Sequence, residues 1–142
     1  MDSEVRNGQV LAGKYRVEEL LGRGGMGVVM AAVHLQLNQK VALKFLTKDA
    51  CQLPEAVTRF QREARSAVQI QSEHVARVLD VGTLESGAPY IVMEYLRGMD
   101  LKDLSHQRGP LPVIEAVDYL LQAMDAVAEA HALGIVHRDL KP

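Results

Sequence analysis

Residues 21–46 read LGRGGMGVVMAAVHLQLNQKVALKFL. The glycines at 22, 24 and 27 have the spacing G-x-G-x-x-G-x-V, which allows a backbone to approach phosphate oxygens because no side chain keeps them away. Apolar and β-branched residues follow over 27–34, and a second such run at 40–46 contains Val-Ala-Leu-Lys ending at Lys44. The stretch therefore predicts two antiparallel strands that follow a glycine-rich turn.

Similar short runs lie on both sides of this stretch. Residues 15–22, 74–82 and 89–96 are rich in β-branched and apolar residues, and Ser86-Gly87 marks a turn between the last two runs. With the two strands above, the pattern predicts five antiparallel strands. Residues 1–10 form a polar lead-in, and we expect regular structure to begin near Lys14.

Residues 54–70 have the period of a helix instead. Phe60 is the centre of an apolar arc, and Glu63 falls within that arc rather than opposite it. Because an acid on a buried face needs a cation, we expect an ion pair between Glu63 and Lys44. A solvated Glu63, and a Lys44 that reaches solvent from the end of its strand, remain the simpler alternatives.

After Gly98 the pattern is helical to near the end of the chain. We expect a short helix over 101–105 and a long helix over 112–133, which Gly134 ends. The change from strands to helices across 94–98 predicts a hinge between two lobes. The fold class is therefore α+β, with a lead-in at 1–10, a strand-rich lobe at 11–95 and a helical part at 96–142.

The glycine motif alone has two other interpretations. One is a glycine-rich hairpin without a ligand, and the other is a dinucleotide-binding fingerprint, which requires a helix directly after Gly27. The strand-like run from Val28 argues against that helix. The pattern G-x-x-x-x-G-K-[ST] of the other common phosphate loop is absent from the sequence.

HRDLKP, at 137–142, is the most specific motif. Asp139 follows a short apolar run, Ile135-Val136, which we expect to be a strand, and it could accept or orient a hydroxyl proton at a cleft. Lys141, two residues later, would point to the same side and could neutralise a transferring phosphate. By itself, HRD is also common in surface turns of mixed charge.

Composition excludes several classes of protein. The formal net charge is −2, which gives the whole chain no attraction to nucleic acid or to anionic membranes. A single cysteine, Cys51, forms no internal disulfide, so we expect a cytoplasmic protein. No signal peptide or membrane span is visible.

Together these motifs resemble the protein kinase family, specifically the eukaryotic-like Ser/Thr kinases of bacteria, over residues 11–142. In this resemblance the glycines cover the ATP phosphates, Lys44 is the third-strand lysine, and Glu63 is the glutamate of helix C. His137, Arg138 and Asp139 match the catalytic loop, with Asp139 as the proposed base.

The resemblance implies further roles. Val29 and Ala42 would sandwich the adenine, Met93 would be the gatekeeper, and the backbone from Glu94 to Leu96 would meet the adenine edge. Arg138 suggests a kinase switched by phosphorylation of an activation loop. The full ATP-binding set comprises Leu21, Gly22, Arg23, Gly24, Gly25, Met26, Gly27, Val28, Val29, Ala42, Lys44, Met93, Glu94 and Leu96.

The family continues beyond HRDLKP with a Mg²⁺-binding asparagine, D-F-G and an activation segment, and none of these lies in the 142 residues. We therefore expect a partial, truncated helical lobe whose long helix leaves an apolar stripe bare. The predicted function is ATP-dependent phosphorylation of Ser or Thr in a protein substrate, with ATP and Mg²⁺ as cofactors. We expect negligible transfer by these residues alone. The alternative is a non-catalytic module that binds ATP or docks onto a kinase.

Overall fold

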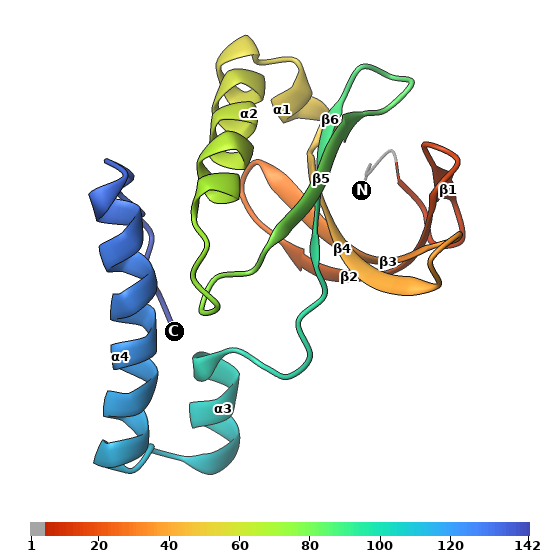
Figure 1. The fold of residues 1–142 in the computed structure, drawn as a ribbon. Helices are drawn as coiled ribbons and strands as arrows, with labels where there is room; N and C mark the ends of the chain where they lie inside the picture. The colour runs from red at the N-terminus through yellow and green to blue at the C-terminus, as the bar shows by residue number, and fades with distance from the viewer. Residues whose placement is uncertain (1–4) are drawn as a thin grey trace. The chain divides into compact units, whose positions relative to one another are not determined.

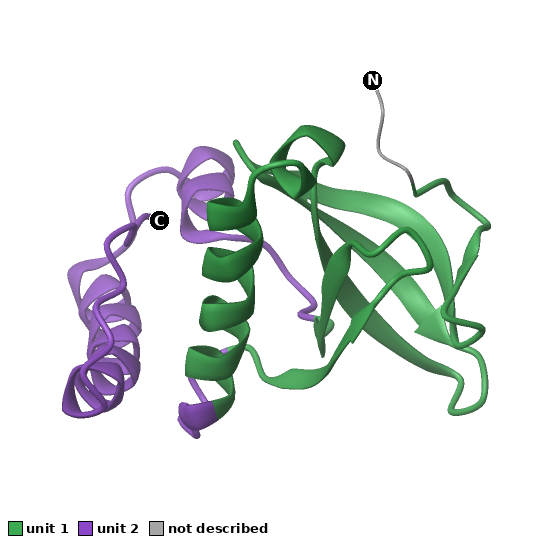
Figure 2. Cartoon of the chain, turned by 90° about the horizontal axis from the view of Figure 1, so that it is seen from above, with its two compact units in different colours: residues 1–68, 76–95 green, residues 69–75, 96–142 purple. Residues whose placement is uncertain are grey.

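The computed structural model describes residues 5–142 in two compact units, coloured separately in Figure 2. The first unit runs to Val68 and continues with Ala76–Tyr95, and the second consists of Gln69–Val75 and Leu96–Pro142. The first unit contains the sheet, and the second contains two of the helices.

The first unit is built on one antiparallel sheet with the strand order β1-β2-β3-β4-β6-β5 (Figure 1). The strands are β1 (Val10–Leu11), β2 (Tyr15–Arg23), β3 (Gly27–His34), β4 (Gln39–Leu46), β5 (Val78–Thr83) and β6 (Pro89–Glu94). The turn between β3 and β4 places Asn38 at φ 49°, a left-handed conformation that asparagine tolerates better than most residues.

Alternation along the strands gives the sheet two different faces. One face carries the main core, where Val17, Leu43 and Val92 are almost completely buried. Phe45 and Tyr90 extend this core, with ring centroids 6.3 Å apart. Successive side chains in a strand point to opposite faces, so the neighbours of these residues lie on the other face of the sheet.

The second face packs against α2 (Pro54–Gln69). Phe60 and Ala64 of this helix form a smaller buried cluster with Ile91 of β6. Pro54 stands in the first helical turn, where its missing N–H removes no intrahelical hydrogen bond. A further short helix, α1 (Lys48–Cys51), precedes it, and the Oγ1 atom of Thr47 accepts a hydrogen bond from the backbone N–H of Ala50 at 3.3 Å.

The second unit contains α3 (Leu101–Arg108) and α4 (Val113–Ala132). The Oδ1 atom of Asp100 caps α3 by accepting from the backbone N–H of Asp103 at 2.8 Å. Gly134, at φ 76°, follows the end of α4 in the left-handed conformation that favours glycine, as the sequence predicts. The backbone N–H of Gln71 donates to Glu129 at 2.6 Å and ties the 69–75 segment to α4.

The apolar stripe expected on α4 is present. Large side chains remain exposed along the helix, among them Ile114 (87%), Met124 (63%) and Leu120 (60%). Of the residues of α4, Ala126 and Ala130 are buried. None of the helices within residues 5–142 combines the length and the apolarity that a membrane crossing needs.

Several predicted details differ from the structure. The sheet has six strands instead of five, because Val10 and Leu11 pair with β2. Val5, in the expected lead-in, is buried in the core at 6% exposure. The strand predicted from residue 74 begins only at Val78, and the first predicted helix of the second unit continues to Arg108. Residues 1–4 of the predicted lead-in lie outside the described part of the chain.

Candidate nucleotide and catalytic-loop site

The glycine-rich turn joins β2 to β3 as a hairpin, and β3 begins at Gly27. A strand therefore follows the motif, so the dinucleotide-binding interpretation, which needs a helix there, is wrong. The backbone N–H of Gly24 donates to the carbonyl of Gly27 at 2.8 Å and closes the turn. A Cβ atom added at Gly22 or Gly25 would meet no atom within 4 Å, so the space beside the turn is open to a ligand.

At position 27 a glycine is required for a different reason. A Cβ atom there would lie 3.0 Å from the carbonyl oxygen of Phe45 on the neighbouring strand. The last glycine of the motif is therefore required by the close approach of β3 and β4, whereas the first glycines leave room above the turn.

Lys44 and Glu63 form the ion pair that the sequence predicts. The Nζ atom of Lys44 lies 3.2 Å from Oε2 of Glu63, which joins β4 to α2. The predicted burial of the carboxylate is wrong, however, because the Glu63 side chain is 54% exposed and that of Lys44 is 35% exposed. The apolar arc of α2 is centred on Ala56, Phe60 and Ala64, one turn apart, and Glu63 lies at its edge.

The residues expected to hold an adenine lie on the same face of the sheet as Lys44. Val29 pairs with Lys44 across β3 and β4, and Ala42 pairs with Met93 across β4 and β6. Directly opposed residues in antiparallel strands point to one face. The fold thus brings the ammonium group of Lys44 and the predicted adenine-binding side chains to the face of the sheet that α2 also covers. Phe60 of α2 lies at this face, with its ring centroid 5.9 Å from Lys44 Nζ.

The end of β6 is held by two sets of contacts. The backbone N–H of Glu94 donates to the carbonyl of Arg77 at 2.9 Å, and the Glu94 carboxylate accepts from the backbone N–H of Arg77 at 2.9 Å. Next to it, Lys40 Nζ lies 4.6 Å from the centre of the Tyr95 ring and 3.4 Å from Glu18. Although desolvation opposes it, the hydrogen bond to Glu18 raises the pKa of Lys40. Leu96, the last predicted adenine contact, is the first residue after β6 that belongs to the second unit.

The catalytic-loop residues belong to the second unit. Lys141 Nζ lies 3.4 Å from Oδ2 of Asp139, so the two side chains point to one side as predicted, and both are about three-quarters exposed (74% and 76%). His137 Nδ1 accepts a hydrogen bond from the backbone N–H of Asp139 at 3.1 Å. Arg138 adopts φ 69°, in the left-handed region that a residue with a side chain rarely occupies.

The strand predicted at Ile135-Val136 is not present, and residues 135–142 have no regular structure. A strand needs a partner that completes its backbone hydrogen bonds, and within the described chain none pairs with this segment. Among residues 5–142 no group of three or more His, Cys, Asp or Glu side chains could hold a metal ion.

One support of the site was missed from the sequence. The backbone N–H of Thr47 donates to the carbonyl of Met26 at 3.0 Å, so the start of α1 is tied to the tip of the glycine-rich turn. The sequence Thr-Lys-Asp-Ala at 47–50 has a threonine in the position of an N-cap, which could have indicated the short helix. No feature of the sequence predicts the backbone hydrogen bond between Thr47 and Met26.

A comparison with protein families identifies the family of this chain. The model of the protein kinase domain matches residues 15–142. The chain belongs to the protein kinase family. The kinase resemblance of its glycine-rich, Val-Ala-Leu-Lys and HRDLKP motifs is thereby confirmed, as is the kinase-like α+β fold.

The kinase relatives are bacterial Ser/Thr kinases. The chain is 41% identical over 141 residues to serine/threonine-protein kinase pkn3 of Myxococcus xanthus, covering 99% of this chain and 26% of that protein. It is 38% identical over 135 residues to PknB of Mycobacterium leprae, covering 93% of this chain and 22% of that protein. The chain thus spans about a quarter of the length of these curated relatives.

Solved kinase structures share the fold. The crystal structure of the PknI kinase domain of Mycobacterium tuberculosis superposes with a TM-score of 0.80 at 33% sequence identity. The match covers 97% of this chain and 55% of the PknI chain. The kinase chain described here therefore corresponds to about half of that solved kinase domain.

Proposed function

We propose that the chain acts in ATP-dependent phosphorylation of serine or threonine in proteins and that its first unit binds ATP. The observation that carries this proposal is the 3.2 Å contact of Lys44 with Glu63, on the face of the sheet that also presents Val29 and Ala42. A lysine fixed by a carboxylate is suited to bind phosphate oxygens. The cytoplasm, where ATP is available, is the compartment we propose.

Each group has a role in this proposal. The open space beside Gly22 and Gly25 allows phosphate oxygens to approach backbone N–H groups. The ammonium of Lys44 attracts the phosphates, and Glu63 keeps it oriented. In the second unit, Asp139 accepts or orients the proton of a substrate hydroxyl, and Lys141 neutralises charge on the transferring phosphate.

Mg²⁺ in this family neutralises the phosphates during transfer. Within residues 5–142 no group of three or more His, Cys, Asp or Glu side chains could hold a metal ion, and we assign no metal step to these residues. Positioning and metal neutralisation account for most of phosphoryl-transfer catalysis. We therefore expect the 142-residue chain to bind ATP but to transfer phosphate negligibly.

The binding part of the proposal is tested by melting the 142-residue chain with and without ATP. A ligand that binds only the folded state raises the melting temperature in a concentration-dependent way. We expect such a rise with ATP and a smaller rise with GTP. Equal melting temperatures with and without ATP would refute the proposed ATP site.

The catalytic part is tested with a chimera in which the remaining kinase segment of M. xanthus pkn3 follows residue 142. We expect this chimera to phosphorylate serine or threonine in a generic protein substrate. Asp139→Asn should reduce the rate by about 10²–10⁴-fold, the range for loss of a general base. Asp125→Asn, an exposed acid on α4, is the matched control and should leave the rate unchanged. A folded chimera that binds ATP without transfer would instead support a non-catalytic ATP-binding module.

A further inference from the structure

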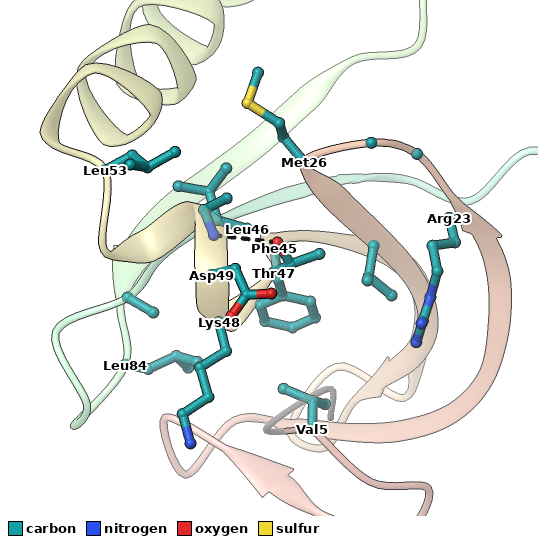
Figure 3. Close-up of a pocket in the computed structure, with 15 residues that line it drawn as sticks. Val5, Arg23, Met26, Phe45, Leu46, Thr47, Lys48, Asp49, Leu53 and Leu84 are labelled. Atoms are coloured by element: carbon teal, nitrogen blue, oxygen red, sulfur yellow. Dashed lines mark hydrogen bonds between the residues drawn. The ribbon is translucent and has the colours of Figure 1, made fainter. Parts of the chain in front are cut away.

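The first unit contains a cavity whose lining includes Arg23 to Met26 and Val28 of the predicted ATP-binding set (Figure 3). Its volume is about 490 Å³, which lies within the range of small-molecule sites in proteins. Val28, Phe45 and Ala88 line it, and each of these is at most 8% exposed. The cavity therefore has an apolar floor formed by the main core.

This cavity lies on the opposite face of the sheet from Lys44. Val28 and Phe45 are cross-strand partners on β3 and β4, and Val29 and Lys44 are the next pair along. Because side chains alternate between faces, these two pairs point in opposite directions. A molecule in the cavity and a nucleotide beside Lys44 would be separated by the sheet.

The two sites nevertheless share the glycine-rich turn. Residues Arg23 to Met26 line the cavity, and the carbonyl of Met26 is tied to the backbone of Thr47, which also lines it. The turn is thus a common wall, reached by a nucleotide from one side and by a cavity ligand from the other.

Charged side chains that form no salt bridge within residues 5–142 also line the cavity. Figure 3 shows Arg23 and Lys48 on different sides of it. Within residues 5–142, neither cation lies within salt-bridge distance of a carboxylate, whereas Lys40, Lys44, Arg108 and Lys141 all do. Asp49 also lines the cavity, so the described lining residues carry two positive charges and one negative charge.

We propose that this cavity binds a small molecule with an apolar body and one carboxylate group. The apolar body would contact Phe45, Val28 and Ala88, and the carboxylate would meet one of the two cations, Arg23 or Lys48. Apolar contact supplies affinity and the charge selects the orientation, as in most small-molecule sites. Such a molecule would bind together with a nucleotide and would contact the glycine-rich turn from its rear.

Biphenyl-4-carboxylate is a suitable probe, with the neutral 4-(hydroxymethyl)biphenyl as its matched control. Both are titrated into the isotope-labelled 142-residue chain and followed by amide NMR shifts. We expect the acid to shift the amides of Phe45, Thr47 and Ala88 and to bind about two- to fivefold more tightly than the alcohol. Saturating ATP should leave this binding in place. Shifts confined to α4, equal binding of the two compounds, or displacement by ATP would each overturn the proposal.

Amino-acid substitutions provide a second test of the proposed cavity site. The double variant Arg23→Ala with Lys48→Ala should weaken binding of the acid about two- to fivefold and leave binding of the alcohol unaffected, because exposed ion pairs are weak. Arg59→Ala with Arg62→Ala, exposed cations of α2 that do not line the cavity, is the control and should change neither affinity. Ala88→Leu should fill the cavity and abolish binding of both compounds, and retained binding would contradict the assignment. Since the probe is titrated without nucleotide, failure of the proposed ATP site would leave this result unchanged.

Discussion

The strength of the Lys44–Glu63 pair can be predicted from its geometry and tested by a double-mutant cycle. Lys44→Met, Glu63→Gln and the double variant are compared with the parent chain. The atoms lie 3.2 Å apart, but the two side chains are 35% and 54% exposed. Solvent screens a pair of this kind, so we expect a coupling free energy of about 0.2–1 kcal/mol.

Native-state hydrogen exchange measures this coupling within the first unit alone. Leu43 lies in β4 next to Lys44 and is completely buried, so exchange of its amide reports opening of the sheet. Raising the ionic strength to about 1 M shortens the Debye length to about 3 Å. The coupling should then fall towards zero.

Two outcomes would refute this reasoning. A coupling above about 2 kcal/mol that salt does not change would indicate a buried pair, the environment that the sequence pattern predicted for Glu63. A coupling of zero at low salt would mean that the observed contact contributes nothing to stability. A third variant, Arg62→Gln on the exposed side of α2, is the control and should show no coupling with Lys44.

Two further predictions concern the packing of each unit. A Cβ atom at Gly82 would overlap the buried ring of Tyr90, so Gly82→Ala should destabilise the first unit by about 1–3 kcal/mol in urea unfolding. The control is Gly25→Ala, because a Cβ atom at Gly25 meets no atom within 4 Å. Equal stability of the two variants would contradict the observed packing of Gly82 against Tyr90. In the second unit, the hydrogen bond from Arg108 lowers the pKa of Glu115, so the ionised carboxylate stabilises the fold at neutral pH. This stabilisation is lost as the pH falls below 4.5, the pKa of this carboxyl group in the unfolded chain. Helix content followed by circular dichroism should therefore decrease between about pH 5 and pH 3, and Glu115→Gln should reduce that decrease; an unchanged acid transition would count against the pair.

The sequence predicted the elements that depend on local patterns. Alternating apolar residues identified β3, β4 and β6, and the helical period identified α2 and α4. The helical period also led to the predicted pairing of Lys44 with Glu63, because an acid within the apolar arc of a helix needs a cation; the pair is present although its carboxylate is half exposed.

Features that depend on distant contacts were not predicted. The two-residue strand Val10–Leu11 is too short for a periodic signal and exists because it pairs with β2. Ile135-Val136 is apolar enough for a strand, but nothing in the described chain pairs with it. The exposure of Glu63 depends on where the helix axis lies over the sheet, and Phe60 and Ala64 determine that position. A helical wheel contains no such information.

The central claim is that the face around Lys44 binds the phosphates of ATP, and calorimetric titration of the 142-residue chain tests it most directly. Lys44→Met should weaken ATP binding about ten- to a hundredfold, the effect of losing a hydrogen bond to a charged group. Lys14→Met, an exposed lysine without a salt bridge in the described chain, should bind ATP like the parent. If Lys44→Met binds ATP as tightly as the parent chain does, the nucleotide site is not where we place it.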